Sequence, residues 1–180
     1  FADAASAFDN VIGVYSLVPD YGSQFLRFGE NGPESVFEIQ YSNQSNWYDW
    51  GCAHCSEGNY AIIMNGPRGW SGPEYAQGWS FNVPTAEFYN SFEDGDSRRD
   101  ATVLDIEAFA AATGANYTEG YDHTGYFNNK YIPRAGESGG QTELNYLTNF
   151  RIIRYSDVLL MAAEAYNRGG IDDGLAQEFL

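Results

Sequence analysis

The chain has 180 residues, of which 43% are hydrophobic and 17% aromatic, which is enough for a folded core and excludes a disordered chain. Its formal net charge of −16 at pH 7 argues against nucleic acid as a partner, because too few cations are present to displace phosphate counterions. The same charge argues against a basic patch that attaches the chain to anionic lipid. An uncharged or cationic partner fits better.

The two ends of the sequence do not resemble natural termini. Phe1 starts inside a helical pattern, and Leu180 stops as another helix begins. No apolar run approaches the length of a membrane span, and no stretch resembles a signal peptide. We therefore expect a piece of a longer protein, with any targeting signal or lipid-attachment cysteine outside it.

The first third of the chain predicts one helix and one strand. The apolar spacing from Phe1 to Val18 is typical of an amphipathic helix that ends at Pro19. Residues Ser35–Tyr41 alternate, with Phe37, Ile39 and Tyr41 pointing one way. This predicts a short strand with one buried face, or a strand-like segment laid over helices.

Residues 42–78 are irregular and unusually rich in large aromatic rings. A long loop of this composition is often functional, because flat apolar rings can pack on the C–H face of a sugar. The alternative is that the rings fold inward as a core of the loop. Five residues are the candidate ligand-binding set: Trp47, Tyr48, Trp50, Trp70 and Tyr75.

The two cysteines, Cys52 and Cys55, lie within this loop. Their spacing favours a local disulfide in an oxidising compartment. Two free thiols, or a metal or redox role, are the alternatives, although one C-x-x-C pair cannot complete a tetrahedral zinc site. We expect no metal ion and no cofactor.

The segment 78–104 predicts a helix followed by a turn. Pro84 suits the start of the helix, and Phe88, Phe92 and Tyr89 form the stripe that should be buried. Asp94, Asp96 and Asp100 resemble part of a calcium-binding loop, but the full spacing of such a loop is missing. Ion pairing with Arg98 and Arg99 is the better interpretation.

The remaining elements follow from capping signals and periodicity. A strand at 102–104 leads into a helix that starts at the N-cap Asp105 and ends at Gly114. The tyrosine-rich segment 115–133 predicts a hairpin. An extended stretch at Ile152-Ile153 then leads into a strongly apolar helix that ends at Gly169-Gly170, and we expect that helix to be buried on more than one side.

Catalytic motifs are absent from the sequence. There is no nucleophile elbow, zinc-protease motif or phosphate-binding loop, and nothing singles out one pair among the 25 acidic residues as a glycosidase pair. An enzyme that acts on glycans is therefore the less favoured alternative.

Several segments together resemble the SusD/RagB family of outer-membrane nutrient-binding lipoproteins of Bacteroidetes. They occur in the family's order and comprise residues Tyr15–Gly22, Glu34–Tyr41, Gly78–Leu104 and Arg154–Tyr166.

The resemblance implies a mainly α fold, in which tetratricopeptide-like helix pairs adjoin a loop-rich region with a few short β-strands. It places residues 1–21 at the end of the helical-repeat half and 22–180 in an incomplete C-terminal region. It also implies a non-catalytic protein, lipid-anchored on the outer face of the outer membrane, that binds oligosaccharides for import with a SusC-type TonB-dependent transporter. Capture of peptides by the same kind of lipoprotein is the alternative.

The family's shared motifs carry over as scaffold and not as ligand contacts. The residues concerned are Trp79, Pro84, Arg98, Arg99, Arg154, Asp157 and Glu164. We expect Trp79 to pack, and Arg154, Asp157 and Glu164 to form internal ion pairs or caps. We expect Arg98 and Arg99 to tie the turn after their helix to neighbouring elements. Because ligand residues differ among family members, the aromatic candidates rest on the residue pattern alone.

Overall fold

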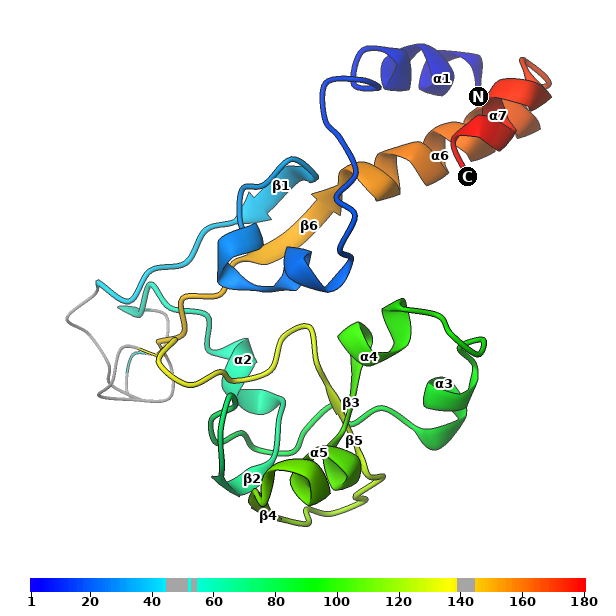
Figure 1. The fold of residues 1–180 in the computed structure, drawn as a ribbon. Helices are drawn as coiled ribbons and strands as arrows, with labels where there is room; N and C mark the ends of the chain where they lie inside the picture. The colour runs from blue at the N-terminus through cyan, green and yellow to red at the C-terminus, as the bar shows by residue number, and fades with distance from the viewer. Residues whose placement is uncertain (45–51, 53–54, 139–144) are drawn as a thin grey trace. The chain divides into compact units, whose positions relative to one another are not determined.

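The computed structural model describes residues 1–44, 52, 55–138 and 145–180, and its elements are drawn in Figure 1. The chain divides into two compact units, which are described separately. The first unit combines Phe1–Asp20, Phe28–Ile39 and Phe150–Leu180, and the second combines Tyr21–Arg27 with Gln40–Asn149. The sequence-based division into 1–21 and 22–180 stays a prediction, since these units follow contacts within the present chain.

The longest helix of the first unit forms as predicted. Strand β6 (Phe150–Arg154) leads directly into α6 (Tyr155–Arg168). Asp157 caps the start of the helix: its Oδ2 accepts from the Arg154 backbone N–H at 2.9 Å, and its Oδ1 accepts from the Arg154 guanidinium at 3.4 Å. The chain leaves it through Gly169 and Gly170, and Gly170 adopts a φ of 58° that favours glycine.

Helix α6 packs against α1 (Ala2–Asp9) and α7 (Asp173–Glu178). Small residues allow the close approach, with Ala5, Ala165 and Ala176 in one cluster with Tyr166. The Tyr166 hydroxyl donates to Asp9 at the end of α1. The expectation that α6 is buried on more than one side is wrong for this chain, because Leu160 and Met161 are exposed on its other side.

The first helix is shorter than predicted. It ends at Asp9, well before Pro19, although the apolar pattern continues to Val18. Gly13 has a φ of 83°, outside the helical region, and its N–H donates to the Tyr155 hydroxyl at 2.9 Å. This tertiary contact replaces a helical hydrogen bond, so the local periodicity does not decide the structure here.

Strand β1 (Ser35–Ile39) is present, but its buried face is not the one that carries Phe37 and Ile39. It pairs antiparallel with β6, and Glu38 lies opposite Arg151. These two charged residues are buried, whereas Phe37 and Ile39 are exposed. The assumption that apolar side chains point inward is wrong here, because an ion pair occupies the buried face.

The second unit holds two small antiparallel sheets. One pairs β2 (Arg68–Ser71) with β4 (Asn116–Thr118), and the other pairs β3 (Val103–Asp105) with β5 (Tyr126–Asn128). The predicted hairpin over 115–133 is therefore wrong, since its two strands pair with partners earlier in the chain.

The helices of the second unit are short: η1 (Gly22–Phe25), α2 (Ala61–Met64), α3 (Ala86–Asn90), α4 (Arg98–Thr102) and α5 (Ile106–Thr113). One more 3-10 turn, η2 (Arg27–Gly29), spans the boundary between the units. Helix α5 matches its prediction at both ends. Asp105 accepts a hydrogen bond from the Ala108 N–H at 2.9 Å, and Gly114 closes the helix at a φ of 72°.

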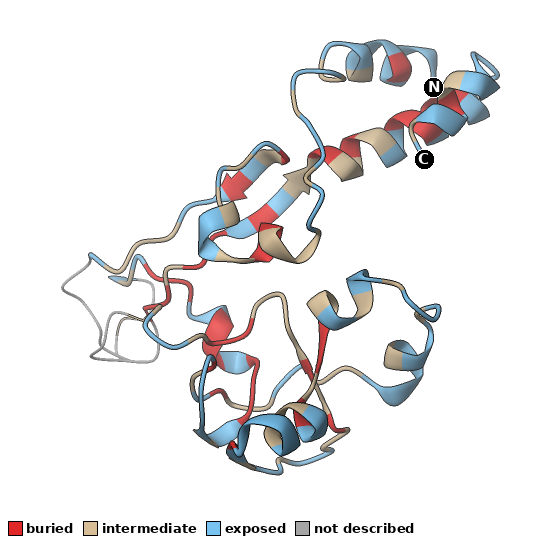
Figure 2. Ribbon diagram, in the orientation of Figure 1, coloured by how far each residue is buried: buried red, intermediate tan, exposed pale blue. Residues whose placement is uncertain are grey.

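Two apolar clusters form the core of the second unit, and their buried segments are red in Figure 2. One contains Leu104, Ile106, Phe127, Ile132 and Tyr75, and the other contains Ile62, Ile63 and Tyr146. Helix α3 joins neither cluster, and none of its residues is buried. The predicted buried stripe at Phe88, Tyr89 and Phe92 is therefore wrong.

Candidate functional site

The central candidates, Trp47, Tyr48 and Trp50, lie outside the residues that the structure describes. Their role stays a prediction from sequence. The described residues do show how the two ends of this loop are held. They also show where the other two candidates lie.

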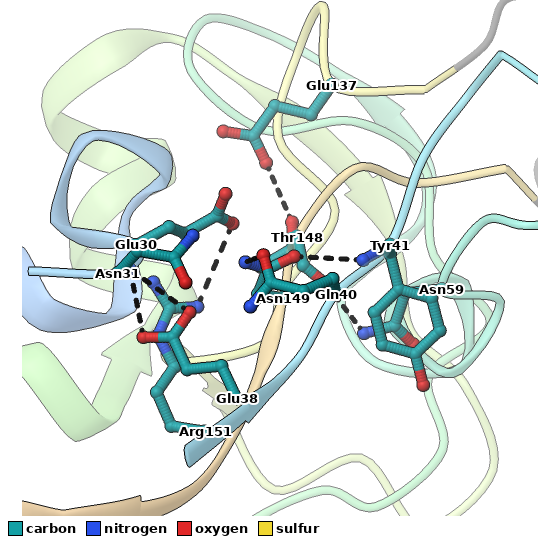
Figure 3. A network of polar contacts seen from close by, with 10 residues as sticks. All are labelled: Glu30, Asn31, Glu38, Gln40, Tyr41, Asn59, Glu137, Thr148, Asn149 and Arg151. Atoms are coloured by element: carbon teal, nitrogen blue, oxygen red, sulfur yellow. Dashed lines mark hydrogen bonds and ion pairs between the residues drawn. The ribbon is translucent and has the colours of Figure 1, made fainter. Parts of the chain in front are cut away.

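The start of the loop is fixed by Asn149, as Figure 3 shows. The Tyr41 backbone N–H donates to Asn149 Oδ1 at 3.0 Å, and Asn149 Nδ2 donates to Gln40 Oε1 at 2.9 Å. Asn149 is 3% exposed, so its amide is committed to these partners. One buried side chain therefore determines where the aromatic loop departs.

Because α2 and β2 lie within the predicted loop 42–78, the aromatic loop that carries Trp47, Tyr48 and Trp50 ends before α2. This end is held by residues 145–149 as well. Asn59 Nδ2 donates to the Thr148 carbonyl at 2.8 Å, and the Asn59 N–H donates to the Tyr146 carbonyl at 2.8 Å. Thr148 Oγ1 donates to Glu137 Oε2 at 3.1 Å (Figure 3). Residues 145–149 thus hold both ends of a loop whose sequence suggested ligand binding.

A disulfide joins Cys52 and Cys55, with their Cα atoms 5.3 Å apart. Of the three alternatives for this pair, the structure has the disulfide. The bond links two positions three residues apart in the sequence and restricts the unfolded chain.

Tyr75 does not face a ligand. It is 4% exposed and lies in the core, with the ring of Phe109 at 5.1 Å and the guanidinium of Arg134 at 5.2 Å. Its hydroxyl donates to Asn129 Oδ1 at 3.2 Å. Burial raises the pKa of Tyr75 to about 12, and the nearby Glu74 carboxylate adds to that shift. The ligand-binding prediction is wrong for Tyr75, which packs inward as the alternative interpretation stated.

Trp70 packs against the same core. Its ring lies 5.8 Å from Tyr75 and 5.9 Å from Phe109. Its indole N–H is buried and has no hydrogen-bond partner within the described part of the chain. Trp70 is partly buried against this core, and a ligand-binding role for it stays a prediction.

The shared-motif residues pack or form ion pairs, while the expectation that Arg98 and Arg99 tie their turn to neighbouring elements stays a prediction. Trp79 packs against the cluster of Ile62 and Ile63, and the Pro84 carbonyl accepts from Thr124 Oγ1 at 2.7 Å, just before α3. The charged motif residues each form an ion pair with a neighbour in sequence: Arg98 with Asp96, Arg99 with Asp100, Arg154 with Asp157, and Glu164 with Arg168.

The structure also exposes aromatic rings that the sequence did not single out as ligand candidates. Phe88 is 46% exposed on α3, and Phe81 is 52% exposed with the Arg68 guanidinium 5.6 Å from its ring centroid. Tyr121 is 92% exposed. Periodicity assigned Phe88 to the interior, so no local signal distinguished it from a core residue.

Within the described ranges, no group of three or more histidine, cysteine, aspartate or glutamate side chains is arranged to hold a metal ion. In the same ranges, no helix combines the length and apolar character that crossing a membrane requires. The candidate site therefore remains the aromatic loop with the residues that hold its ends.

Comparison with known proteins identifies the family. The model of the SusD family matches residues 104–180. SusD-like protein P2 of Formosa agariphila is 30% identical over 161 residues, which cover 84% of this chain and 30% of that protein.

Solved structures agree over almost the whole chain. Surface glycan-binding protein A from Bacteroides thetaiotaomicron, in complex with laminarihexaose, is 32% identical with a TM-score of 0.87. A laminarin-binding SusD-like protein is 35% identical with a TM-score of 0.86. Each match covers 99% of this chain and 41% of the other.

The chain belongs to the SusD/RagB family and has a SusD-like fold, as its sequence motifs indicated. It spans about a third of the curated relative and about two fifths of these solved structures.

Proposed function

We propose that this protein binds neutral oligosaccharides at the cell surface and does not act on them chemically. The observation that carries the proposal is the likeness, over 99% of the chain, to a glycan-binding protein solved with laminarihexaose. A likeness of the same extent to a laminarin-binding protein supports it further. The net charge of −16 favours a neutral glycan over an anionic one.

Within this proposal, Trp47 and Trp50 supply flat rings for the sugar, and Tyr48 supplies a ring with a polar edge. The loop that carries them is held at both ends by Asn149 and Asn59. Each stacked ring contributes about 1 kcal/mol beyond the area it buries, so a single site binds weakly.

The proposal has two further parts. The protein delivers the bound glycan to a SusC-type TonB-dependent transporter, and a lipid anchor holds it at the outer membrane. They are supported by membership of the SusD family. Co-purification of the transporter with the full-length protein tests the first. Protease accessibility of the protein on intact cells tests the second.

Calorimetric titration of the full-length protein with laminarihexaose tests glycan binding. We expect the Trp47→Ala/Trp50→Ala variant to bind about tenfold or more weakly, the loss of two stacked rings. Tyr121→Ala removes a ring that is 92% exposed outside the loop, and it should bind as the wild type does.

Three results would contradict the proposal. The first is no binding of any neutral hexose oligosaccharide, and the second is preferential binding of peptides. The third is release of new reducing ends from laminarin, which would show that the protein is an enzyme.

A further inference from the structure

The second unit carries an open hollow of about 430 Å³ beside α3 and α4, formed by residues outside the 42–78 loop. This volume lies within the range of about 300–1,000 Å³ that small-molecule sites occupy. The rings of Tyr21, Phe88 and Phe92 contribute to its wall.

The described residues leave Phe88 nearly half exposed. Helix α3 buries none of its residues, and Phe88 is 46% exposed. Its ring meets Phe92 edge to face, with the centroids 5.3 Å apart and the planes at 68°. A ring held in place by a neighbour and nearly half exposed is the kind of surface on which the C–H face of a pyranose packs.

Polar groups in the same hollow can form hydrogen bonds with the hydroxyls of that sugar. Arg98 Nη2 lies 2.6 Å from Asp96 Oδ2, and the Arg98 backbone N–H donates to Asp96 Oδ1 at 2.9 Å. The Arg98 side chain is 64% exposed. The Asp96 side chain is only 12% exposed, and both of its oxygens already accept hydrogen bonds from Arg98. Asp96 therefore fixes the guanidinium, whose remaining N–H groups can donate to a sugar hydroxyl.

The charges in the hollow balance, unlike those of the chain as a whole. Two acidic residues, Glu93 and Asp96, and two basic residues, Arg98 and Lys130, line it. Lys130 lies over the rings of Tyr21 and Phe25, 5.1 and 4.6 Å from their centroids. Because the hollow has no net charge and the whole chain carries −16, a neutral ligand fits better than an anionic glycan or a cation.

We propose that this hollow is a second glycan subsite for a neutral hexopyranose unit, which packs on Phe88 and accepts hydrogen bonds from the Arg98 guanidinium that Asp96 holds in place. The inference rests on the proposed glycan-binding function and adds a site that does not depend on Trp47 and Trp50. Two separate contacts with one polysaccharide chain would raise the overall affinity without any single strong site.

The experiment starts from the Trp47→Ala/Trp50→Ala variant of the full-length protein, titrated with laminarihexaose. We expect residual binding, and a further weakening of about two- to tenfold when Phe88→Ala is added. Adding Phe88→Tyr keeps the ring and should keep the residual binding. Adding Tyr121→Ala is the matched control and should change nothing.

A site-resolved readout separates this subsite from the loop. With 4-fluorophenylalanine incorporated, the ¹⁹F resonance of Phe88 is assigned as the signal missing from Phe88→Tyr, and it should shift as laminarihexaose is added. If it stays fixed at concentrations that saturate the wild type, the subsite is wrong while the proposed function stands. If the wild type binds no neutral glycan, both proposals fail.

Discussion

Glu38 and Arg151 face each other across β1 and β6 in a buried ion pair, with Glu38 Oε1 3.7 Å from Arg151 Nε. Their side chains are 1% and 3% exposed. Glu30 Oε1 lies 3.9 Å from Arg151 Nη1, and the Asn31 N–H donates to the Glu38 carboxylate at 3.2 Å (Figure 3). Buried charge thus occupies the face of this sheet where apolar side chains were expected.

Removing one member of this pair should strongly destabilise the protein. Arg151→Met leaves the Glu38 carboxylate buried beside Glu30, and such a loss typically costs about 3–5 kcal/mol. Denaturant unfolding of the full-length protein measures the difference in the free energy of unfolding. The double variant Glu38→Leu/Arg151→Met removes both charges and should lose less than Arg151→Met alone.

The matched control is Arg168→Met, since Arg168 pairs with Glu164 on the exposed side of α6. Exposed pairs of this kind contribute about 0–1 kcal/mol. Equal losses from Arg151→Met and Arg168→Met would mean that the buried pair is no more important than a surface pair.

The sequence predictions are correct where the determining contact lies within a few residues, and wrong where it comes from a distant part of the chain. Helices α5 and α6 were predicted with their ends because Asp105, Gly114 and the Arg154–Asp157 pair act within a few residues of themselves. The face of β1 was predicted wrongly because Glu38 is buried by Arg151, which is far away along the chain.

The same division applies to the candidate site. The anchors of the aromatic loop, Asn149 and Asn59, carry no local pattern, because their partners lie in other segments. Composition alone could not separate Tyr75, which packs against Phe109, from a ring that faces solvent. Phe88 has helical spacing like a core residue, yet it is 46% exposed.

The caps of α5 provide a test of local stabilisation. Asp105→Ala removes the acceptor for the Ala108 N–H and should reduce the free energy of unfolding by about 0.5–2 kcal/mol.

At the other end of α5, Gly114→Ala forces an alanine to a φ of 72° and should reduce the free energy of unfolding by about 1 kcal/mol. Nothing lies within 4 Å of a Cβ built at Gly114, so the loss is due to the backbone and not to a clash. Thermal or denaturant unfolding measures both, and Gly114→Asn should be milder than Gly114→Ala. An unchanged Gly114→Ala protein would contradict the strain argument.

The buried hydroxyl of Tyr75 predicts a loss of stability at alkaline pH. The pKa of Tyr75 is about 12 in the folded chain and about 10 in the unfolded chain, so between these values the unfolded chain releases a proton that the folded chain retains. The stabilisation is therefore complete below pH 10 and is lost as the pH rises towards 12, by roughly 2–3 kcal/mol in all.

The measurement compares the wild type with Tyr75→Phe by denaturant unfolding from pH 9 to 11.5. Tyr75→Phe loses the hydrogen bond to Asn129 and should be less stable by about 1 kcal/mol at pH 9. Because phenylalanine has no proton to release, the difference should shrink and then reverse as the pH rises. Parallel pH profiles for the two proteins would show that Tyr75 ionises as readily in the folded chain as in the unfolded one.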